Sequence, residues 1–271
     1  MTTSTILITG GTGRTGRRVA DRVAGHNPRI TSRSGPTPFD WDDPDTWDAA
    51  LDGCSAAYLC YSPDLALPGV DDIIKRFVSR AGALGVDRLV LLSGRGEDGA
   101  RACEDIVLAA TPTATVVRCS WFQENFSEHF LRGSVLAGRI AVPAGDVREP
   151  FVSLDDVADI AALALTSGGY DGQVLELTGP QSITFTEAAD QLSRAIDRPI
   201  SYESVDGETF VLEQVAAGVH PDEAGALAWL FDEVLDGRNV ATTSTIEQVL
   251  GRPARSFADY ARSAAAAGAW S

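Results

Sequence analysis

The chain has 271 residues, 44% of them hydrophobic and 22% charged, a composition typical of a globular protein and not of a disordered chain. A formal net charge of −16 argues against direct binding to nucleic acid, which depends on clustered Lys and Arg. No apolar run reaches the roughly 18–20 residues of a membrane span, and the N-terminus has no basic signal-peptide start. We therefore expect a cytoplasmic protein that does not associate with membranes.

The cysteines and histidines form no recognisable set. The four cysteines share no CxxC spacing, and the three histidines are scattered along the chain. We therefore expect neither a metal site nor a disulfide framework. The residues are Cys54, Cys60, Cys103 and Cys119, and His26, His129 and His220.

Short apolar runs alternate with amphipathic stretches over the first 130 residues, which is typical of βαβ units in a parallel sheet. With right-handed crossovers, such units build a doubly wound α/β sheet of the Rossmann type, whose ligands bind at the carboxyl ends of the strands. We expect strands at Thr5–Thr9, Arg29–Arg33, Ala56–Tyr61, Arg88–Leu92 and Thr115–Arg118, and helices at Thr15–Ala24, Val70–Leu84 and Ala100–Ala110.

The pattern loosens after about residue 125. Strand-like segments recur there among longer helical ones, so we expect a smaller, mostly helical substrate or lid lobe. The predicted domains are residues 1–150 and residues 151–271, with some segments of the second returning to the main sheet. The segments are strands at Gln173–Leu177 and Ile200–Ser204, a strand end passing into a helix at Phe151–Thr166, and helices at Phe185–Ile196, Glu208–Ala217, Asp222–Leu235 and Ser256–Ala267.

A glycine loop lies between the first predicted strand and the helix that follows it. Gly10 permits a tight turn, Gly13 lets the backbone approach a pyrophosphate, and Gly16 lets the helix pack close to the sheet. The amino end of that helix offers free N–H groups to the phosphates. The position of this G-x-x-G-x-x-G pattern indicates a dinucleotide site, to which Thr12, Arg14 and Thr15 of the loop also contribute.

The end of the second strand indicates which dinucleotide is bound. Ser32 and Arg33 stand where a carboxylate would bind the ribose of NAD, and a guanidinium beside hydroxyls suits a 2′-phosphate. We therefore expect NADP(H), with Arg14 as a second positive contact. Asp40 can accept a hydrogen bond from the adenine amino group while Trp41 packs nearby, although both residues also fit a solvated turn.

Six stretches, in order along nearly the whole chain, carry a resemblance to a known family. They are Thr9–Gly16, Phe39–Trp41, Val86–Ser93, Val117–Phe126, Pro150–Ala158 and Leu250–Pro253 before Phe257. The chain resembles the NmrA-like group of atypical short-chain dehydrogenase/reductases, and within it the branch of festuclavine synthase and agroclavine dehydrogenase. The group includes NADP(H)-sensing regulators, quinone reductases and reductases of small metabolites.

The resemblance implies further contacts with the cofactor. The loop of Tyr61 and Ser62 would lie along the nicotinamide ribose, and Ser93 would flank the nicotinamide ring. The strand end at Arg118–Phe122, with Cys119, Trp121 and Phe122, would flank it as well. This chain has Cys119 where family members often carry proline.

Ordinary short-chain reductases protonate their product with a tyrosine assisted by a lysine, beside a serine on the fifth strand. Ser93 stands in the place of the serine, but no Tyr or Lys occurs between Arg76 and Gly169, so the pair is absent. A substrate that needs no enzymic proton would explain this absence. Otherwise another group serves as the acid, and the candidates, with Ser93, are Tyr61, Cys119, Glu124 and His129.

The segment after the predicted strand at Thr115–Arg118 is rich in aromatic residues. Its side chains would form flat apolar walls with polar handles around a small substrate, although core packing is about as consistent with any one aromatic. Aromatic residues of the second lobe could form a lid, with core packing favoured for them. The expected substrate contacts are Trp121, Phe122, Asn125, Phe126, Phe210 and Trp229.

The sequence thus predicts an NADPH-dependent reductase of a small organic molecule, acting as a monomer or homodimer. Hydride would pass directly to an iminium, quinone-like or enone acceptor without the Tyr-Lys pair. The alternative is a non-catalytic NADP(H) redox sensor that acts through a protein partner.

Overall fold

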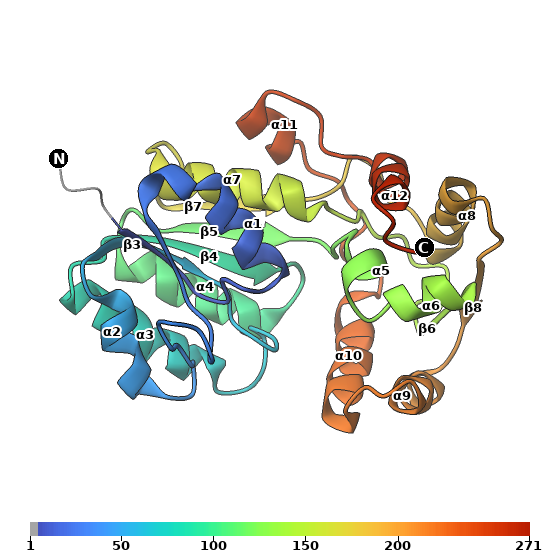
Figure 1. Ribbon diagram of the computed structural model, residues 1–271, viewed down its shortest axis with the longest axis horizontal. Helices are drawn as coiled ribbons and strands as arrows, with labels where there is room; N and C mark the ends of the chain where they lie inside the picture. The colour runs from blue at the N-terminus through green and yellow to red at the C-terminus, as the bar shows by residue number, and fades with distance from the viewer. Residues whose placement is uncertain (1–4) are drawn as a thin grey trace. The chain divides into compact units, whose positions relative to one another are not determined.

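The computed structural model describes residues 5–271 and divides into two compact units (Figure 1). The first unit contains the described residues up to Cys119 together with Leu154–Leu177 and Thr245–Arg252. The second contains Ser120–Ser153, Thr178–Ser244 and Pro253–Ser271. Two segments of the second half of the chain therefore belong to the strand-rich unit.

A six-stranded parallel sheet forms the centre of the first unit. Its strands are β1 (Thr5–Ile8), β2 (Pro28–Ile30), β3 (Cys54–Leu59), β4 (Arg88–Gly94), β5 (Thr115–Cys119) and β7 (Gln173–Leu177). The strand order is β2-β1-β3-β4-β5-β7, and every neighbouring pair is parallel. This order confirms the predicted doubly wound fold and puts its topological switch point between β1 and β3.

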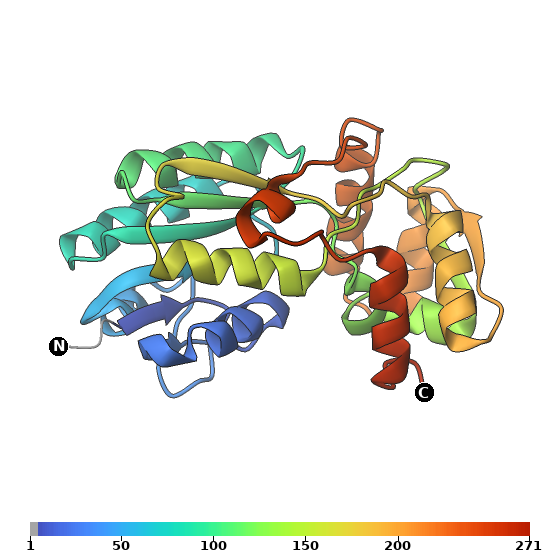
Figure 2. The ribbon, with the colours of Figure 1, turned by 90° about the horizontal axis from the view of Figure 1, so that it is seen from above.

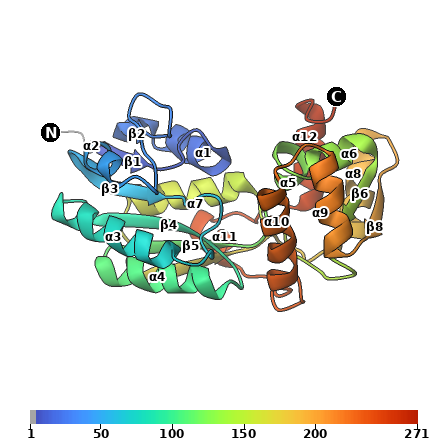
Figure 3. The same cartoon turned by 90° about the horizontal axis from the view of Figure 1, so that it is seen from below.

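Helices cover both faces of this sheet (Figures 2 and 3). On one face α1 (Arg14–Arg22) packs against α7 (Leu154–Thr166), and on the other α3 (Val70–Ala83) packs against α4 (Asp98–Ala110). Burial on both sides explains why β4 reads as an unbroken apolar run, with Leu89, Val90 and Leu91 at most 1% exposed. Two short helices complete the unit, α2 (Trp47–Leu51) and α11 (Thr245–Leu250), together with the 3-10 turns Ala24–His26 and Pro44–Thr46.

Ion pairs hold α7 to the elements beside it. Arg22 of α1 pairs with Asp155 and Asp159 of α7. Arg252, just after α11, pairs with Asp159 at 2.7 Å and with Asp156 at 2.6 Å, and the Asp156 side chain is only 2% exposed. These acidic residues of α7 therefore join α1 and the α11 segment to α7.

The second unit is mostly helical, and it begins at Ser120, inside the range 1–150 predicted for the first domain. It contains α5 (Asn125–Glu128), α6 (Arg132–Ala137), α8 (Phe185–Ile196), α9 (Gly207–Ala216), α10 (Pro221–Val234) and α12 (Phe257–Ala266). Its two strands, β6 (Arg139–Val142) and β8 (Ser201–Ser204), pair in parallel. Aromatic rings fill its core, where Phe126 contacts Phe151, Phe185 and Phe257 at centroid distances of 5.1–6.0 Å.

Within residues 5–271, no helix has the length and apolar character that crossing a membrane requires.

Candidate cofactor-binding site

The loop between β1 and α1 turns so tightly that only glycine fits at its key positions. Gly10 has a φ of +59°, a conformation that costs other residues energy. A Cβ on Gly16 would lie 2.3 Å from the carbonyl oxygen of Gly10, so a side chain there would collide with backbone. The amide of Gly13 donates to the same oxygen at 2.8 Å. The loop therefore has the compact form that dinucleotide binding requires.

The amino end of α1 presents backbone N–H groups without a side-chain cap. Gly13 is its N-cap and has no side chain to accept from the first amides, and the first turn contains no acidic residue. Thr12 and Gly13 are both exposed. This end of the helix carries the positive end of the helix dipole, so an uncapped and exposed terminus suits a phosphate group.

The loop after β2 presents Arg33 to solvent. The amides of Gly35 and Phe39 both donate to the carbonyl oxygen of Ser32, at 3.3 and 3.1 Å, and so fold the loop back on itself. Arg33 lies exposed in that turn, and no residue among 5–271 forms a hydrogen bond or an ion pair with its guanidinium. A cation beside Ser32 that no described residue pairs with fits the predicted 2′-phosphate contact.

Trp41 is a core residue that also fixes the end of β3. It is 7% exposed, and its ring packs edge-on against Phe39 and Phe77. Its Nε1 donates to the carbonyl oxygen of Cys60 at 3.1 Å. Asp40 accepts from the amide of Asp42 at 3.1 Å, as in a turn. The structure thus gives Trp41 a packing role, and adenine recognition by either residue stays a prediction.

The loop that follows β3 is fixed beneath the glycine loop. The amide of Cys60 donates to Oγ1 of Thr9 at 2.8 Å, and its Sγ lies 3.5 Å from Oγ1 of Thr15. Burial raises the pKa of the Cys60 thiol. Burial, followed by the charge of Asp42, also raises the pKa of Tyr61, so both groups keep their protons at neutral pH. Ser62 follows Tyr61 in this loop.

A network of charges that the sequence did not reveal lies at the ends of β4 and β5. Ser93 donates to the buried carboxylate of Glu104 at 2.6 Å, and Arg118 donates to the same carboxylate through Nε at 2.9 Å. Glu176 of β7 accepts from Arg118 at 3.4 Å and from Arg95 at 2.7 Å. The Glu104 carboxylate, with help from Glu176, raises the pKa of Arg118, so the guanidinium stays charged.

The five candidates for a proton donor lie in different environments. Glu124 is 3% exposed in the second unit, where it accepts a hydrogen bond from Oγ of Ser153 at 3.2 Å. The hydroxyl of Ser93 already donates a hydrogen bond to Glu104, and Cys119 is 4% exposed with a thiol pKa that burial raises. Tyr61 is half-buried at the end of β3, whereas His129 is exposed and belongs to the second unit. Within the first unit, the hydroxyl proton of Ser93 is therefore engaged in a hydrogen bond, and the raised pKa of Cys119 makes its thiol a poor acid.

The predicted substrate-contact residues all belong to the second unit. Trp121 is half-buried and its ring lies 4.6 Å from that of Phe231. Phe126 and Phe210 are fully buried in the aromatic core, so the structure favours core packing for both. The other three differ in exposure: Phe122 is half-buried, Asn125 is 7% exposed and Trp229 is 42% exposed.

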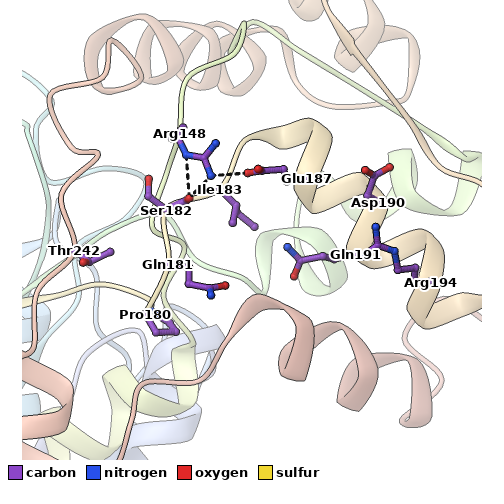
Figure 4. A pocket seen from close by; sticks show the side chains of 10 residues that line it. All are labelled: Arg148, Pro180, Gln181, Ser182, Ile183, Glu187, Asp190, Gln191, Arg194 and Thr242. Atoms are coloured by element: carbon purple, nitrogen blue, oxygen red, sulfur yellow. Dashed lines mark hydrogen bonds and ion pairs between the residues drawn. The ribbon is translucent and has the colours of Figure 1, made fainter.

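A polar hollow of about 580 Å³ lies beside α8 in the second unit (Figure 4). Arg148 donates to the carbonyl oxygen of Ser182 at 2.7 Å and pairs with Glu187 at 2.8 Å. Asp190 and Arg194 of α8 also line it. Arg148 thus joins its loop to the first turn of α8, and charges of both signs surround the hollow.

No protein-family model matches the chain, but individual proteins do. A festuclavine dehydrogenase of Aspergillus fumigatus is 31% identical over 284 residues, which cover 95% of this chain and 96% of that protein. Prestalk A differentiation protein A of Dictyostelium discoideum is 26% identical over 280 residues, covering 96% and 92%. The likeness therefore extends over nearly the full length of each protein.

Solved structures share the fold of this chain. Triphenylmethane reductase of Citrobacter sp., crystallised with NADP(H), superposes with a TM-score of 0.81 at 21% identity, covering 96% of this chain and 99% of that one. An NADPH-dependent quinone oxidoreductase of Escherichia coli gives a TM-score of 0.78 at 20% identity, with 95% and 98% covered. The motifs, the sheet order and the full-length similarity confirm the resemblance seen in the sequence, and the chain belongs to the NmrA-like group of atypical short-chain dehydrogenase/reductases.

Proposed function

We propose that this protein is an NADPH-dependent reductase that transfers hydride directly to a small organic acceptor. The acceptor classes we propose are an iminium, a quinone-like compound or an enone. The observation that carries the proposal is the amino end of α1, which has no side-chain cap and follows the tight turn at Gly10. With it stands Arg33 in the loop after β2, whose guanidinium has no partner among residues 5–271.

The residues of the first unit fit the two charged parts of the cofactor. The exposed amides around Gly13 suit the pyrophosphate, and the guanidinium of Arg33 suits the 2′-phosphate that distinguishes NADPH from NADH. When bound, NADPH supplies a hydride from C4 of its dihydronicotinamide ring, which forms a new C–H bond on the acceptor and leaves NADP⁺. The relatives named above as reductases and dehydrogenases support this assignment.

The acceptor should be one whose reduction needs no proton from the protein. The Tyr-Lys pair is missing from residues 77–168, and the hydroxyl of Ser93 donates its hydrogen bond to Glu104. An iminium carbon becomes a neutral amine when it receives hydride, so it needs no acid. Catalysis then comes from holding donor and acceptor in line, which can lower a barrier by several kcal/mol, up to about 7–11.

Calorimetric titration with NADPH and NADH, followed by a turnover screen, tests the proposal. The screen measures NADPH oxidation at 340 nm with an iminium, a quinone and an enone. We expect NADPH to bind more tightly than NADH and at least one acceptor to be reduced. Tight NADPH binding without turnover on any acceptor would count against a reductase and favour the redox sensor.

A further inference from the structure

The hydroxyl of Ser93 has its proton engaged within the protein and its lone pairs unused. Ser93 is the last residue but one of β4, near the carboxyl edge of the parallel sheet. Its Oγ donates to Oε1 of Glu104 on α4 at 2.6 Å, and the two residues are 4% and 1% exposed. No other residue among 5–271 forms a hydrogen bond with this hydroxyl. Its lone pairs are therefore left for a donor that the described residues do not supply.

Arg118 fixes the direction of this hydrogen bond. An arginine side chain can only donate, and Arg118 donates to both oxygens of Glu104, through Nε to Oε1 at 2.9 Å and through Nη2 to Oε2. Both carboxylate oxygens are thus acceptors, so Ser93 is the donor between them. Ser93 and Arg118 are paired residues of β4 and β5, which places their side chains on the same face of the sheet. Glu104 therefore acts as a positioning residue that holds the serine proton.

The fixed polarity of Ser93 limits the groups that it can bind. A free serine hydroxyl can donate or accept, whereas the hydroxyl of Ser93 can only accept. It cannot stabilise the carbonyl or alkoxide oxygen of a hydride acceptor, because such an oxygen needs a donor. The group that fits it is an N–H or O–H of a ligand.

The end of β4 lies in the half of the sheet that should receive the nicotinamide. A doubly wound sheet binds one mononucleotide on each side of its switch point, and Arg33 marks the adenosine half at β2. The strands β3, β4 and β5 belong to the other half. The nicotinamide ring carries a carboxamide whose NH₂ group can only donate. The ribose hydroxyls can both donate and accept, so they do not require a partner of fixed polarity.

We propose that Ser93 accepts a hydrogen bond from the carboxamide N–H of the nicotinamide, and that Glu104 sets this polarity by holding the serine proton. This inference rests on the proposed reductase function, because it requires the cofactor. The first unit then recognises both ends of NADP(H), with Arg33 at the 2′-phosphate and Ser93 at the carboxamide.

A cofactor analogue isolates this contact from the rest of the site. 3-Acetylpyridine adenine dinucleotide phosphate keeps the carbonyl of the carboxamide but has a methyl group in place of NH₂, so it lacks the donor. Ser93→Ala removes the acceptor. Glu104→Gln offers the serine an amide that can donate to it, so the hydroxyl no longer has a fixed polarity. Ser79→Ala, which removes an exposed hydroxyl from α3, is the matched control.

The measurement is binding, which does not depend on turnover. Calorimetry gives the dissociation constants of NADP⁺ and of the analogue for each protein. We expect the wild-type protein to prefer NADP⁺ by about tenfold, as one hydrogen bond allows. Ser93→Ala should reduce this preference about fivefold to tenfold by weakening NADP⁺ binding, with binding of the analogue changed by no more than about twofold. Ser79→Ala should keep the wild-type preference.

Glu104→Gln should reduce the preference in the same direction, and circular dichroism checks that this variant is folded. A reduced preference in Ser93→Ala with a wild-type preference in folded Glu104→Gln would overturn the positioning role of Glu104. If Glu104→Gln does not fold, Ser93→Ala alone decides the contact.

An unchanged preference in Ser93→Ala, or an equal loss for both ligands, would overturn the contact between Ser93 and the carboxamide. These outcomes leave the reductase proposal standing, because NADP⁺ still binds. If the wild-type protein binds neither NADP⁺ nor NADPH, the reductase proposal fails, and this inference fails with it.

Discussion

The hydroxyl of Ser93 and the carboxylate of Glu104 form a hydrogen bond of 2.6 Å inside the first unit, with both residues at most 4% exposed. The hydroxyl of Ser93 is the donor in this bond, so its lone pairs remain available to accept a hydrogen bond. Ser93, which stands where ordinary short-chain reductases have their serine, is thus part of a buried network with Glu104 and Arg118.

This network predicts a large difference in stability between two variants. Glu104→Ala leaves the guanidinium of Arg118 without its buried partner and should lower the free energy of unfolding by about 3–5 kcal/mol. Ser93→Ala removes one hydrogen bond and should cost about 1 kcal/mol. Urea denaturation of both variants measures the difference. Equal losses would mean that the Glu104–Arg118 pair adds nothing to stability.

Arg33→Asp should weaken NADPH binding about a hundredfold and NADH binding by no more than about twofold. The substitution removes a charge-assisted hydrogen bond to the 2′-phosphate and adds repulsion, and NADH lacks that phosphate. Calorimetric titration with both cofactors makes the measurement, and NADH is the internal control. An equal loss for both cofactors would show that Arg33 does not recognise the phosphate.

Gly16→Ala should abolish cofactor binding and destabilise the fold by about 1–3 kcal/mol, because its Cβ would collide with the backbone of Gly10 and Gly11. Gly25→Ala is the matched control, since a Cβ there meets no atom within 4 Å. Thermal unfolding and NADPH fluorescence test both variants. A Gly16→Ala protein that binds NADPH normally would disprove the close packing of the loop.

Stability should fall at alkaline pH because the buried thiols ionise only after unfolding. Burial raises the pKa of Cys103 to about 12, whereas a thiol in the unfolded chain has a pKa of about 8.5. The stabilisation is complete below about pH 8.5 and decreases as the pH rises toward 12, by at most about 1.4 kcal/mol per pH unit for each such thiol.

Urea unfolding at pH 7, 9 and 10.5 measures this dependence, with Cys103→Ala as the comparison. The variant should show a smaller loss between pH 9 and 10.5 than the wild-type protein. Identical slopes would assign the alkaline loss to other groups, such as Tyr58, whose pKa burial also raises.

The sequence predicted the elements whose formation depends on residues close together in the chain, through apolar periodicity, helix capping and glycine spacing. The strand at Gln173–Leu177 and the helix at Phe185–Ile196 have the expected bounds, because apolar periodicity and a Thr184–Glu187 capping box mark them. The position of the glycine loop between β1 and α1 followed from its spacing together with the strand and helix patterns on either side of it. The strand β6 was not predicted, because it lies in the stretch after residue 125 where the alternation of strand-like and helical patterns loosens.

The parts that sequence reasoning did not predict depend on contacts between distant residues. Nothing in the local sequence around Ser93 shows that its hydroxyl meets Glu104, eleven positions along on another element. The packing of Phe210 in the core depends likewise on rings from other segments. The sequence around Glu97 indicates only the start of a helix. The position of its carboxylate, in the space that a Cβ on Gly94 would fill, is seen only in the structure.

The interleaving of the two units also determines when the sheet can be completed during synthesis on the ribosome. β5 gains its second neighbour, β7, only after the chain has passed through Ser120–Ser153 of the other unit. Until α7 and β7 emerge, the nascent chain exposes the amides of β5 and the part of the sheet face over β3, β4 and β5 that α7 covers, which favours aggregation. A fragment ending at residue 150 would remain permanently in that state. Proteolytic or genetic dissection of this protein should therefore follow the contacts within each unit and not the order of the sequence.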